Sequence, residues 1–320
     1  MAVSERDMTA LAESVCAGDR RALARAITLI ESTRDDHRDQ AEELLEMLLP
    51  HTGGAIRVGI SGVPGVGKST FIEVFGQHVI APGHDVAVLA VDPSSRRTGG
   101  SILGDKTRME KLSRAPEAFI RPSPTAGTLG GVARRTREVL LACEASGFDV
   151  ILVETVGVGQ SETAVADLVD MFVLLLLPGG GDELQGIKKG IMELADLVVV
   201  NKADGDLRDA AGRAASEYAN ALRLLHPLTA DWVPEVLTCS SLEGAGIPEI
   251  WDRIGDFRQI VTASGTFETK RAEQARRWMW GEVDETLLSA FRRHPNVRKK
   301  LTELEAKVSE SRLTPSAAAQ

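Results

Sequence analysis

The most constraining feature of the sequence is the octapeptide Gly62-Val63-Pro64-Gly65-Val66-Gly67-Lys68-Ser69. It fits G-x-x-x-x-G-K-[ST], the glycine-rich loop whose backbone N–H groups surround the phosphates of a nucleoside triphosphate. The apolar run Ile56 to Ser61 predicts a strand before the loop, and apolar residues at helical spacing from Thr70 to Ile80 predict a helix after it. This order indicates an α/β fold that binds a nucleotide.

Each part of this loop has an expected role. The glycines let the backbone approach the phosphates, and the helix N-terminus at Ser69 and Thr70 adds a favourable dipole. We expect Lys68 to reach the β- and γ-phosphates and the Ser69 hydroxyl to bind Mg²⁺. The alternative is a glycine-rich turn that only closes a strand against a helix.

The rest of the chain divides into three predicted parts. Residues 1–54 have helical spacing and predict a helical N-terminal extension, and residues 261–320 predict a helical C-terminal arm that breaks at His294-Pro295 and ends in a disordered tail. Between them, residues 55–260 alternate apolar runs with helical patterns, which predicts a doubly wound, mostly parallel sheet. The further runs are Val86–Val91, Val150–Val153, Met171–Leu177, Leu197–Val200 and Val236–Cys239.

Charge and cysteine content limit the class of protein. The 320 residues include 46 acidic and 37 basic ones, and the net charge of −9 argues against a nonspecific nucleic-acid or anionic-membrane surface. The 3 cysteines are widely spaced and fit neither a disulfide framework nor a zinc motif. The N-terminus lacks the basic character of a signal peptide, and the most apolar run is too short to span a bilayer. We therefore predict a cytoplasmic protein with protein or small-molecule partners.

A second motif, Asn201-Lys202-Ala203-Asp204, directly follows the predicted strand Leu197–Val200. It has the N-K-x-D pattern of a guanine site. The Asp204 carboxylate can accept both the ring N1–H and the 2-amino group of guanine, a donor pair that adenine lacks. We expect Asn201 to brace the base-binding loop and the aliphatic stem of Lys202 to cover one face of the base.

A companion loop at Ser240-Ser241-Leu242 would complete the base pocket, because it also follows a predicted strand. Serine pairs occur in many turns, so this assignment is the weaker one. For the guanine motif itself, the alternative is a polar turn in which Asp204 caps a helix.

Acidic residues follow two other predicted strands. Asp92 follows the run Val86–Val91, and Glu154 opens Glu154-Thr155-Val156-Gly157, where many GTPases have D-x-x-G. We expect both carboxylates to help hold Mg²⁺ and the Gly157 N–H to sense the γ-phosphate. Asp105, in a glycine-rich segment that would act as a mobile switch, is a third candidate. The alternatives are a simple turn at Asp92 and a solvated carboxylate at Asp105.

These motifs together resemble the MeaB/ArgK family, the methylmalonyl-CoA mutase-associated GTPases, which are related to nickel-insertion GTPases. The resemblance implies a Mg²⁺-dependent enzyme that hydrolyses GTP to GDP. It implies a chaperone that docks on an adenosylcobalamin-dependent methylmalonyl-CoA mutase, gates its cofactor loading, and protects or reactivates it. The matching stretches are Gly62–Thr70, Val91–Ser95, Gly99–Met109, Glu154–Glu162 and Asn201–Asp204.

The resemblance also implies a homodimer built largely through the C-terminal arm. The apolar residues of the arm are compatible with this, but they would pack equally well on the arm's own domain. They are Trp278, Trp280, Leu287, Leu288 and Phe291.

The position directly after Gly157 holds Val158, where a Ras-like GTPase has its water-orienting glutamine. We therefore expect slow intrinsic hydrolysis that a partner accelerates by ordering a loop. The best candidate is residues 178–189, in which Gln185 would position water and Lys188 would supply charge. The alternative is a glycine loop that caps a helix with solvated lysines.

Three other functions share part of this chemistry. A nickel-delivery metallochaperone GTPase often has His-rich or Cys-containing metal sites, whereas this chain has 6 His and no C-x-x-C. A small-molecule kinase or transport-linked ATPase would bind ATP, against which the N-K-x-D motif argues. A nonhydrolysing binding module would not need Lys68, Ser69 and the carboxylates together.

Overall fold

The computed structural model describes residues 5–32, 34–91, 109–123, 129–155, 161–179, 189–225, 229 and 231–320. The chain divides into two compact units, Met1–Ala272 and Glu273–Gln320. The first unit contains the sheet and both sequence motifs, and the second contains most of the C-terminal helices.

A seven-stranded sheet forms the centre of the first unit, in the order β3-β2-β4-β1-β5-β6-β7. All of its strand pairs are parallel, which confirms the predicted doubly wound α/β fold. The central strand β1 leads into the phosphate loop, so this loop starts at the middle of the carboxyl edge of the sheet. The strands are β1 Ile56–Gly62, β2 Val86–Val91, β3 Ala118–Ser123, β4 Val150–Thr155, β5 Met171–Leu176, β6 Leu197–Val200 and β7 Glu235–Thr238.

Strand β3 is the one strand that the apolar runs did not predict. It contains Arg121 and Pro122, so its sequence has neither a continuous apolar run nor a clean alternation. Because β3 lies at the edge of the sheet, the missing N–H of Pro122 is tolerated there. Strands β2 and β6 have the predicted bounds, and the remaining strands differ from the predicted runs by one or two residues at their ends.

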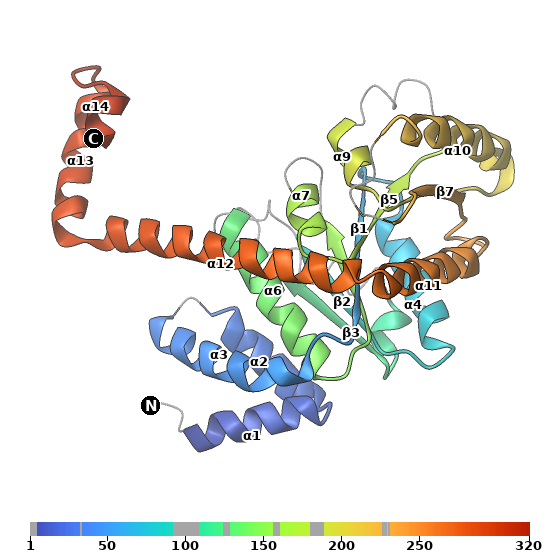
Figure 1. Ribbon diagram of the computed structural model, residues 1–320, viewed down its shortest axis with the longest axis horizontal. Coiled ribbons are helices and arrows are strands. Elements are labelled where there is room, and N and C mark those ends of the chain that lie inside the picture. The colour runs from blue at the N-terminus through green and yellow to red at the C-terminus, as the bar shows by residue number, and fades with distance from the viewer. Residues whose placement is uncertain are drawn as a thin grey trace. The chain divides into compact units, whose positions relative to one another are not determined.

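Helices pack on both faces of the sheet (Figure 1). On one face, α4 (Lys68–Ile80) contributes Phe71 and Phe75 to the core that contains Val58 of β1. On the other face, α7 (Ser161–Ala166) packs so closely on β1 that a Cβ atom on Gly59 would lie 3.1 Å from Val165 Cγ1. Val58 and Gly59 are consecutive residues of β1 and therefore face opposite sides of the sheet, so α4 and α7 lie on opposite faces.

The N-terminal helices form a small cluster of their own that packs on α6 (Leu129–Ala145), as Figure 1 shows. They are α1 Glu5–Cys16, α2 Arg20–Ile30 and α3 Asp35–Leu48, followed by the short η1 Leu49–His51. Leu23, Ala26 and Ile27 are fully buried, which confirms the helical spacing expected for this segment.

The remaining helices follow the strands and then form the C-terminal region. No helix of the described ranges is both long and apolar enough to cross a membrane. The elements are η2 Leu112–Arg114, α9 Lys189–Leu194, η3 Gly205–Leu207, α10 Arg208–Leu222, α11 Ile247–Ala263, α12 Thr266–Arg293, α13 Pro295–Ser309 and α14 Pro315–Ala319.

Two expectations about the C-terminal end have different outcomes. The break at His294 is confirmed, because His294 is the N-cap of α13 and Pro295 is its first residue. The expectation of a disordered tail is wrong for α14. Thr314 caps this short helix by accepting a hydrogen bond from Ala317 N at 3.3 Å.

A cluster of buried ion pairs lies at the amino edge of the sheet, opposite the phosphate loop. Arg57 of β1 donates to Glu144 Oε1 of α6 at 2.6 Å, and its backbone N–H donates to Asp170 Oδ2 at 2.8 Å. Arg271 of α12 donates to both Asp170 oxygens, at 2.8 and 2.7 Å. The cluster therefore joins β1, α6, the start of β5 and the first turns of α12.

Candidate nucleotide-binding site

The phosphate loop adopts a conformation that two of its glycines make possible. Gly67 has φ of +95°, and a Cβ atom there would lie 3.0 Å from Asn201 Nδ2. At Gly62 a Cβ atom would lie 2.4 Å from the Leu175 carbonyl oxygen. The first position needs left-handed backbone and the second needs close approach to β5, so both favour glycine.

Lys68 begins helix α4 and turns back over the loop. Its Nζ donates to the Gly62 carbonyl oxygen at 2.7 Å. Burial lowers the pKa of the Lys68 ammonium, while the carboxylates of Glu154 and Glu162 raise it. The Lys68 ammonium and the Glu154 carboxylate thus lie at the base of the loop, where the helix N-terminus also favours an anion.

Oxygen atoms suited to Mg²⁺ gather beside Lys68. Ser69 Oγ donates to Glu154 Oε1 at 3.3 Å, and Glu154 is 3% exposed. A hydroxyl and a carboxylate are the hard oxygen ligands that Mg²⁺ takes in nucleotide sites, so these two residues fit the metal expected from the sequence. The adjacent Thr155 hydroxyl donates to Ser61 Oγ at 2.9 Å and ties the ends of β4 and β1 together.

Five residues of the predicted site lie outside the described residues: Asp92, Asp105, Gly157, Gln185 and Lys188. Within the described ranges, no group of three or more His, Cys, Asp or Glu side chains is arranged to hold a metal.

Asn201 connects the guanine motif to the phosphate loop. Its Nδ2 donates to the Val66 carbonyl oxygen at 2.9 Å, and its Oδ1 accepts from Ser241 N at 3.1 Å and Ser241 Oγ at 2.8 Å. The neighbouring Lys202 has φ of +61° and donates through Nζ to the Gly65 carbonyl oxygen at 2.7 Å. The two motifs and the 240–242 loop are therefore one hydrogen-bonded assembly.

Asp204 lies beside this assembly and is partly exposed. Ser240 Oγ donates to Asp204 Oδ2 at 2.5 Å, which fixes the orientation of the carboxylate. Asp204 is the N-cap of η3 but makes no side-chain capping hydrogen bond, so helix capping does not explain this carboxylate. Leu242, at the tip of the loop, is 82% exposed.

Three features of this site had no signal in the sequence motifs. They are the hydrogen bonds from Asn201 and Lys202 to the phosphate loop, the Ser61–Thr155 pair, and the effect of the Glu162 carboxylate on the pKa of Lys68. Each depends on the proximity of residues from different strands, which a motif does not encode.

The reactivity of the Cys239 thiol tests how tightly the loops at Asn201–Asp204 and Ser240–Leu242 pack against each other. It is 2% exposed and donates through Sγ to Asn201 Oδ1 at 3.4 Å, and burial raises the pKa of its thiol to about 12. Since the thiolate is the reactive form, we expect iodoacetamide at pH 8 to leave Cys239 unmodified while it labels the less buried Cys16. Mass spectrometry of the labelled peptides checks this, and equal labelling of both thiols would show that the loops open readily.

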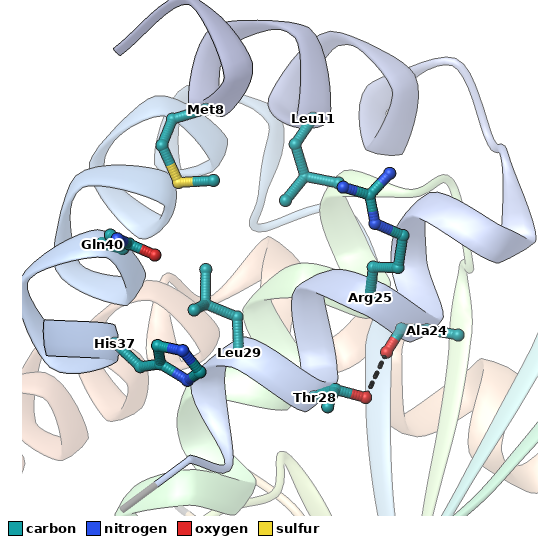
Figure 2. A pocket seen from close by; sticks show the side chains of 8 residues that line it. All are labelled: Met8, Leu11, Ala24, Arg25, Thr28, Leu29, His37 and Gln40. Atoms are coloured by element: carbon teal, nitrogen blue, oxygen red, sulfur yellow. Dashed lines mark hydrogen bonds between the residues drawn. The ribbon is translucent and has the colours of Figure 1, made fainter. Parts of the chain in front are cut away.

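A separate hollow lies among α1, α2 and α3 (Figure 2). It has a volume of about 430 Å³, and Met8, Leu11 and Leu29 provide apolar surface while Arg25, His37 and Gln40 add polar groups. None of its lining residues belongs to the phosphate loop or the guanine motif.

Comparison with known proteins identifies the family. Residues 23–296 match the family described as Methylmalonyl Co-A mutase-associated GTPase MeaB. The mouse mitochondrial methylmalonic aciduria type A homolog is 52% identical over 312 residues, covering 94% of this chain and 75% of that protein. The GTPase ArgK of Escherichia coli is 53% identical over 272 residues, covering 85% of this chain and 82% of that protein.

A solved structure described as a LAO/AO transport system kinase has a TM-score of 0.79 and 39% identity, covering 100% of this chain and 97% of that one. The parallel sheet, the phosphate and guanine loops and these matches all agree with the resemblance to the MeaB/ArgK family that the sequence motifs indicated. The chain therefore belongs to the MeaB family of methylmalonyl-CoA mutase-associated GTPases, and its predicted enzyme class is confirmed.

Proposed function

We propose that this protein hydrolyses GTP as a chaperone of an adenosylcobalamin-dependent methylmalonyl-CoA mutase, gating cofactor loading and protecting or reactivating the mutase. The observation that carries the proposal is the match over residues 23–296 to a family whose description joins a GTPase to this mutase. The similarity to a mammalian protein named for methylmalonic aciduria supports the same client.

The phosphate side of the site would bind the triphosphate through the loop amides and Lys68. Ser69 and Glu154, together with Asp92 and Asp105, would hold Mg²⁺. When bound, Mg²⁺ neutralises charge on the β- and γ-phosphate oxygens. Lys68 would stabilise charge that develops on the transferred phosphoryl group, with water as the acceptor.

The guanine side would bind the base through Asp204, with Lys202 and Leu242 beside the ring. Ser240 and Ser241 support this role because they hold Asp204 and Asn201 in place. The solved structural relative is described as a kinase, which would use ATP. Selection of guanine favours a GTPase instead, since adenine would leave the Asp204 carboxylate without its donor pair.

A partner would complete the catalytic apparatus. Val158 replaces the water-orienting glutamine of Ras-like enzymes. We therefore propose that the mutase orders residues 178–189, so that Gln185 positions water and Lys188 supplies charge. We also propose a homodimer, because the second unit exposes apolar side chains. Trp280, Leu287 and Phe291 are 59%, 64% and 58% exposed within that unit.

The test is hydrolysis of GTP in Mg²⁺ by the full chain, with and without the mutase, and with ATP as the competing substrate. We expect slow GTP turnover alone, at least about tenfold stimulation by the mutase, and little ATP turnover. If the mutase does not change the rate of GTP turnover, the proposal that the mutase is the client is wrong. If the protein transfers phosphate to a small solute, the proposal that it is a GTPase chaperone is wrong.

Lys188→Ala tests the proposed role of residues 178–189. We expect this variant to lose the stimulation by the mutase, because the charge that the partner orders is gone. The neighbouring Lys189→Ala is the control, since it removes the same charge one residue away. Full stimulation of the Lys188 variant would show that its side chain is only solvated.

A further inference from the structure

The hollow among α1, α2 and α3, which we name the N-terminal hollow, takes no part in the nucleotide site. Its volume of about 430 Å³ lies within the range of about 300–1,000 Å³ that small-molecule pockets occupy. The three helices otherwise pack against one another in pairs. Protein interiors leave few voids larger than a water molecule, so an opening of this size among packed helices is a candidate binding site.

One part of the lining is apolar. Met8 and Leu11 of α1 and Leu29 of α2 point toward the same space in Figure 2. Met8 and Leu11 are 4% and 6% exposed, whereas Leu29 is half-buried. The methionine side chain adapts its shape to what it contacts. This part of the hollow can therefore hold a compact hydrocarbon body, which gains free energy by leaving water.

The polar part of the lining has one fixed positive charge, that of Arg25. This guanidinium makes no hydrogen bond or ion pair with any residue that the structure describes, although acidic residues outnumber basic ones in the chain by 46 to 37. Asp7 and Asp19 line a neighbouring hollow that shares Arg25, and neither carboxylate pairs with it. The charge of Arg25 is thus open to a partner from outside the chain.

The other polar side chains of the hollow do not oppose an anion. Its described lining residues include no Asp or Glu. Gln40 of α3 has no hydrogen-bond partner in the described part of the chain, so its amide N–H₂ can donate. His37 pairs through Nδ1 with Ser32 Oγ at 2.8 Å, which leaves Nε2 for another partner. The lining therefore complements a molecule that is apolar at one end and negatively charged at the other.

We propose that the N-terminal hollow binds a small amphipathic monocarboxylate, with its apolar body against Met8, Leu11 and Leu29 and its carboxylate on Arg25. The planar guanidinium matches both oxygens of a carboxylate. One guanidinium balances one negative charge, which fits a carboxylate better than a phosphate group that carries nearly two. The proposal does not depend on the GTPase function, because none of the lining residues belongs to the nucleotide site.

The measurement is isothermal titration calorimetry of the full chain with octanoate, and with neutral 1-octanol as the matched probe. We expect octanoate to bind at least about tenfold more tightly than octanol. Arg25→Gln is expected to weaken octanoate binding about tenfold and to leave octanol binding within about twofold, since a hydrogen bond to a charged group contributes about this factor. Arg21→Gln removes the same charge one turn earlier on α2, outside the lining, and is expected to change neither affinity by more than about twofold.

Leu29→Trp tests the apolar part, because the larger side chain fills the hollow. We expect it to weaken the binding of both probes at least about tenfold. If circular dichroism shows that this variant does not fold, Arg25→Gln alone decides. Octanoate that does not bind the unmodified chain, or that binds no better than octanol, would overturn the proposal. Unchanged octanoate affinity in either folded variant would also overturn it, because the probe would then bind elsewhere. Failure of GTP hydrolysis would contradict the proposed function and leave this site untouched.

Discussion

Asp204→Asn is expected to convert this protein from a guanine-nucleotide binder to a xanthine-nucleotide binder. In the proposed site, the carboxylate of Asp204 would offer two acceptors to the N1–H and 2-amino donors of guanine, whereas an Asn amide would present its N–H₂ to the 2-amino group. In xanthine that amino group is a carbonyl oxygen, which the Asn amide can pair. Sites built to pair a specific donor reject the wrong partner strongly, so we expect GTP affinity to fall about 100-fold or more.

Competition binding with GTP, XTP and ATP measures this change. Asp206→Asn is the matched control, because Asp206 is exposed in the adjacent η3 and loses the same charge. Ser240 Oγ can still donate to the remaining side-chain oxygen of the Asn variant, so the loop should keep its shape. Unchanged GTP affinity without gain of XTP binding would mean that Asp204 serves the loop and not the base.

The second large effect is on stability. Asp170→Ala is expected to lower the free energy of unfolding by about 3–5 kcal/mol, because the Arg57 N–H loses its acceptor and the Arg271 guanidinium loses its paired carboxylate in a buried place. Arg271 keeps only its hydrogen bonds to the Gly53 and Ala55 carbonyl oxygens and a more distant carboxylate, Glu144, at 3.8 Å. Asp170 is 2% exposed, so water cannot replace the lost acceptor fully. Asp170→Asn is expected to cost less, since its oxygen still accepts from the Arg57 N–H.

Urea denaturation of the full chain, followed by circular dichroism, measures both variants. Glu110→Ala serves as the control because it breaks the exposed Glu110–Arg114 ion pair, whose side chains are 68% and 76% exposed. That pair is expected to contribute less than about 1 kcal/mol. Equal effects of Asp170→Ala and Glu110→Ala would show that burial adds nothing to the cluster at the amino edge.

The sequence predicts the central sheet well because its inner strands are buried on both faces. Runs such as Val86–Val91 and Leu197–Val200 are continuous and apolar, and the structure has strands with the same bounds. Edge strand β3 is not predicted from apolar runs, because an edge strand needs less apolar surface and tolerates Pro122. The short helix α14 depends on a single capping interaction at Thr314, which composition alone does not reveal.

The candidate site is predictable where neighbouring residues in the chain do the chemistry. The loop that ends at Lys68-Ser69 and the motif that begins at Asn201 are each continuous, and their local spacing carries the information. The contacts between them were not predictable, because they depend on the order of β1, β5 and β6 in the sheet. The same is true of the cluster around Asp170, whose partners come from separate elements.

The hydrogen bonds of Asn201 and Lys202 also have a consequence for synthesis of the chain. They join residues 135 and 137 positions apart, so the phosphate loop leaves the ribosome long before its supports exist. At roughly 5–20 residues per second, about 7 to 27 seconds pass before the guanine motif is made. Contacts that distant in the chain form slowly even after release, because a long loop must close first. The growing chain therefore carries an unfinished nucleotide loop, and GTP can act as a folding ligand only once the second half of the sheet has been added.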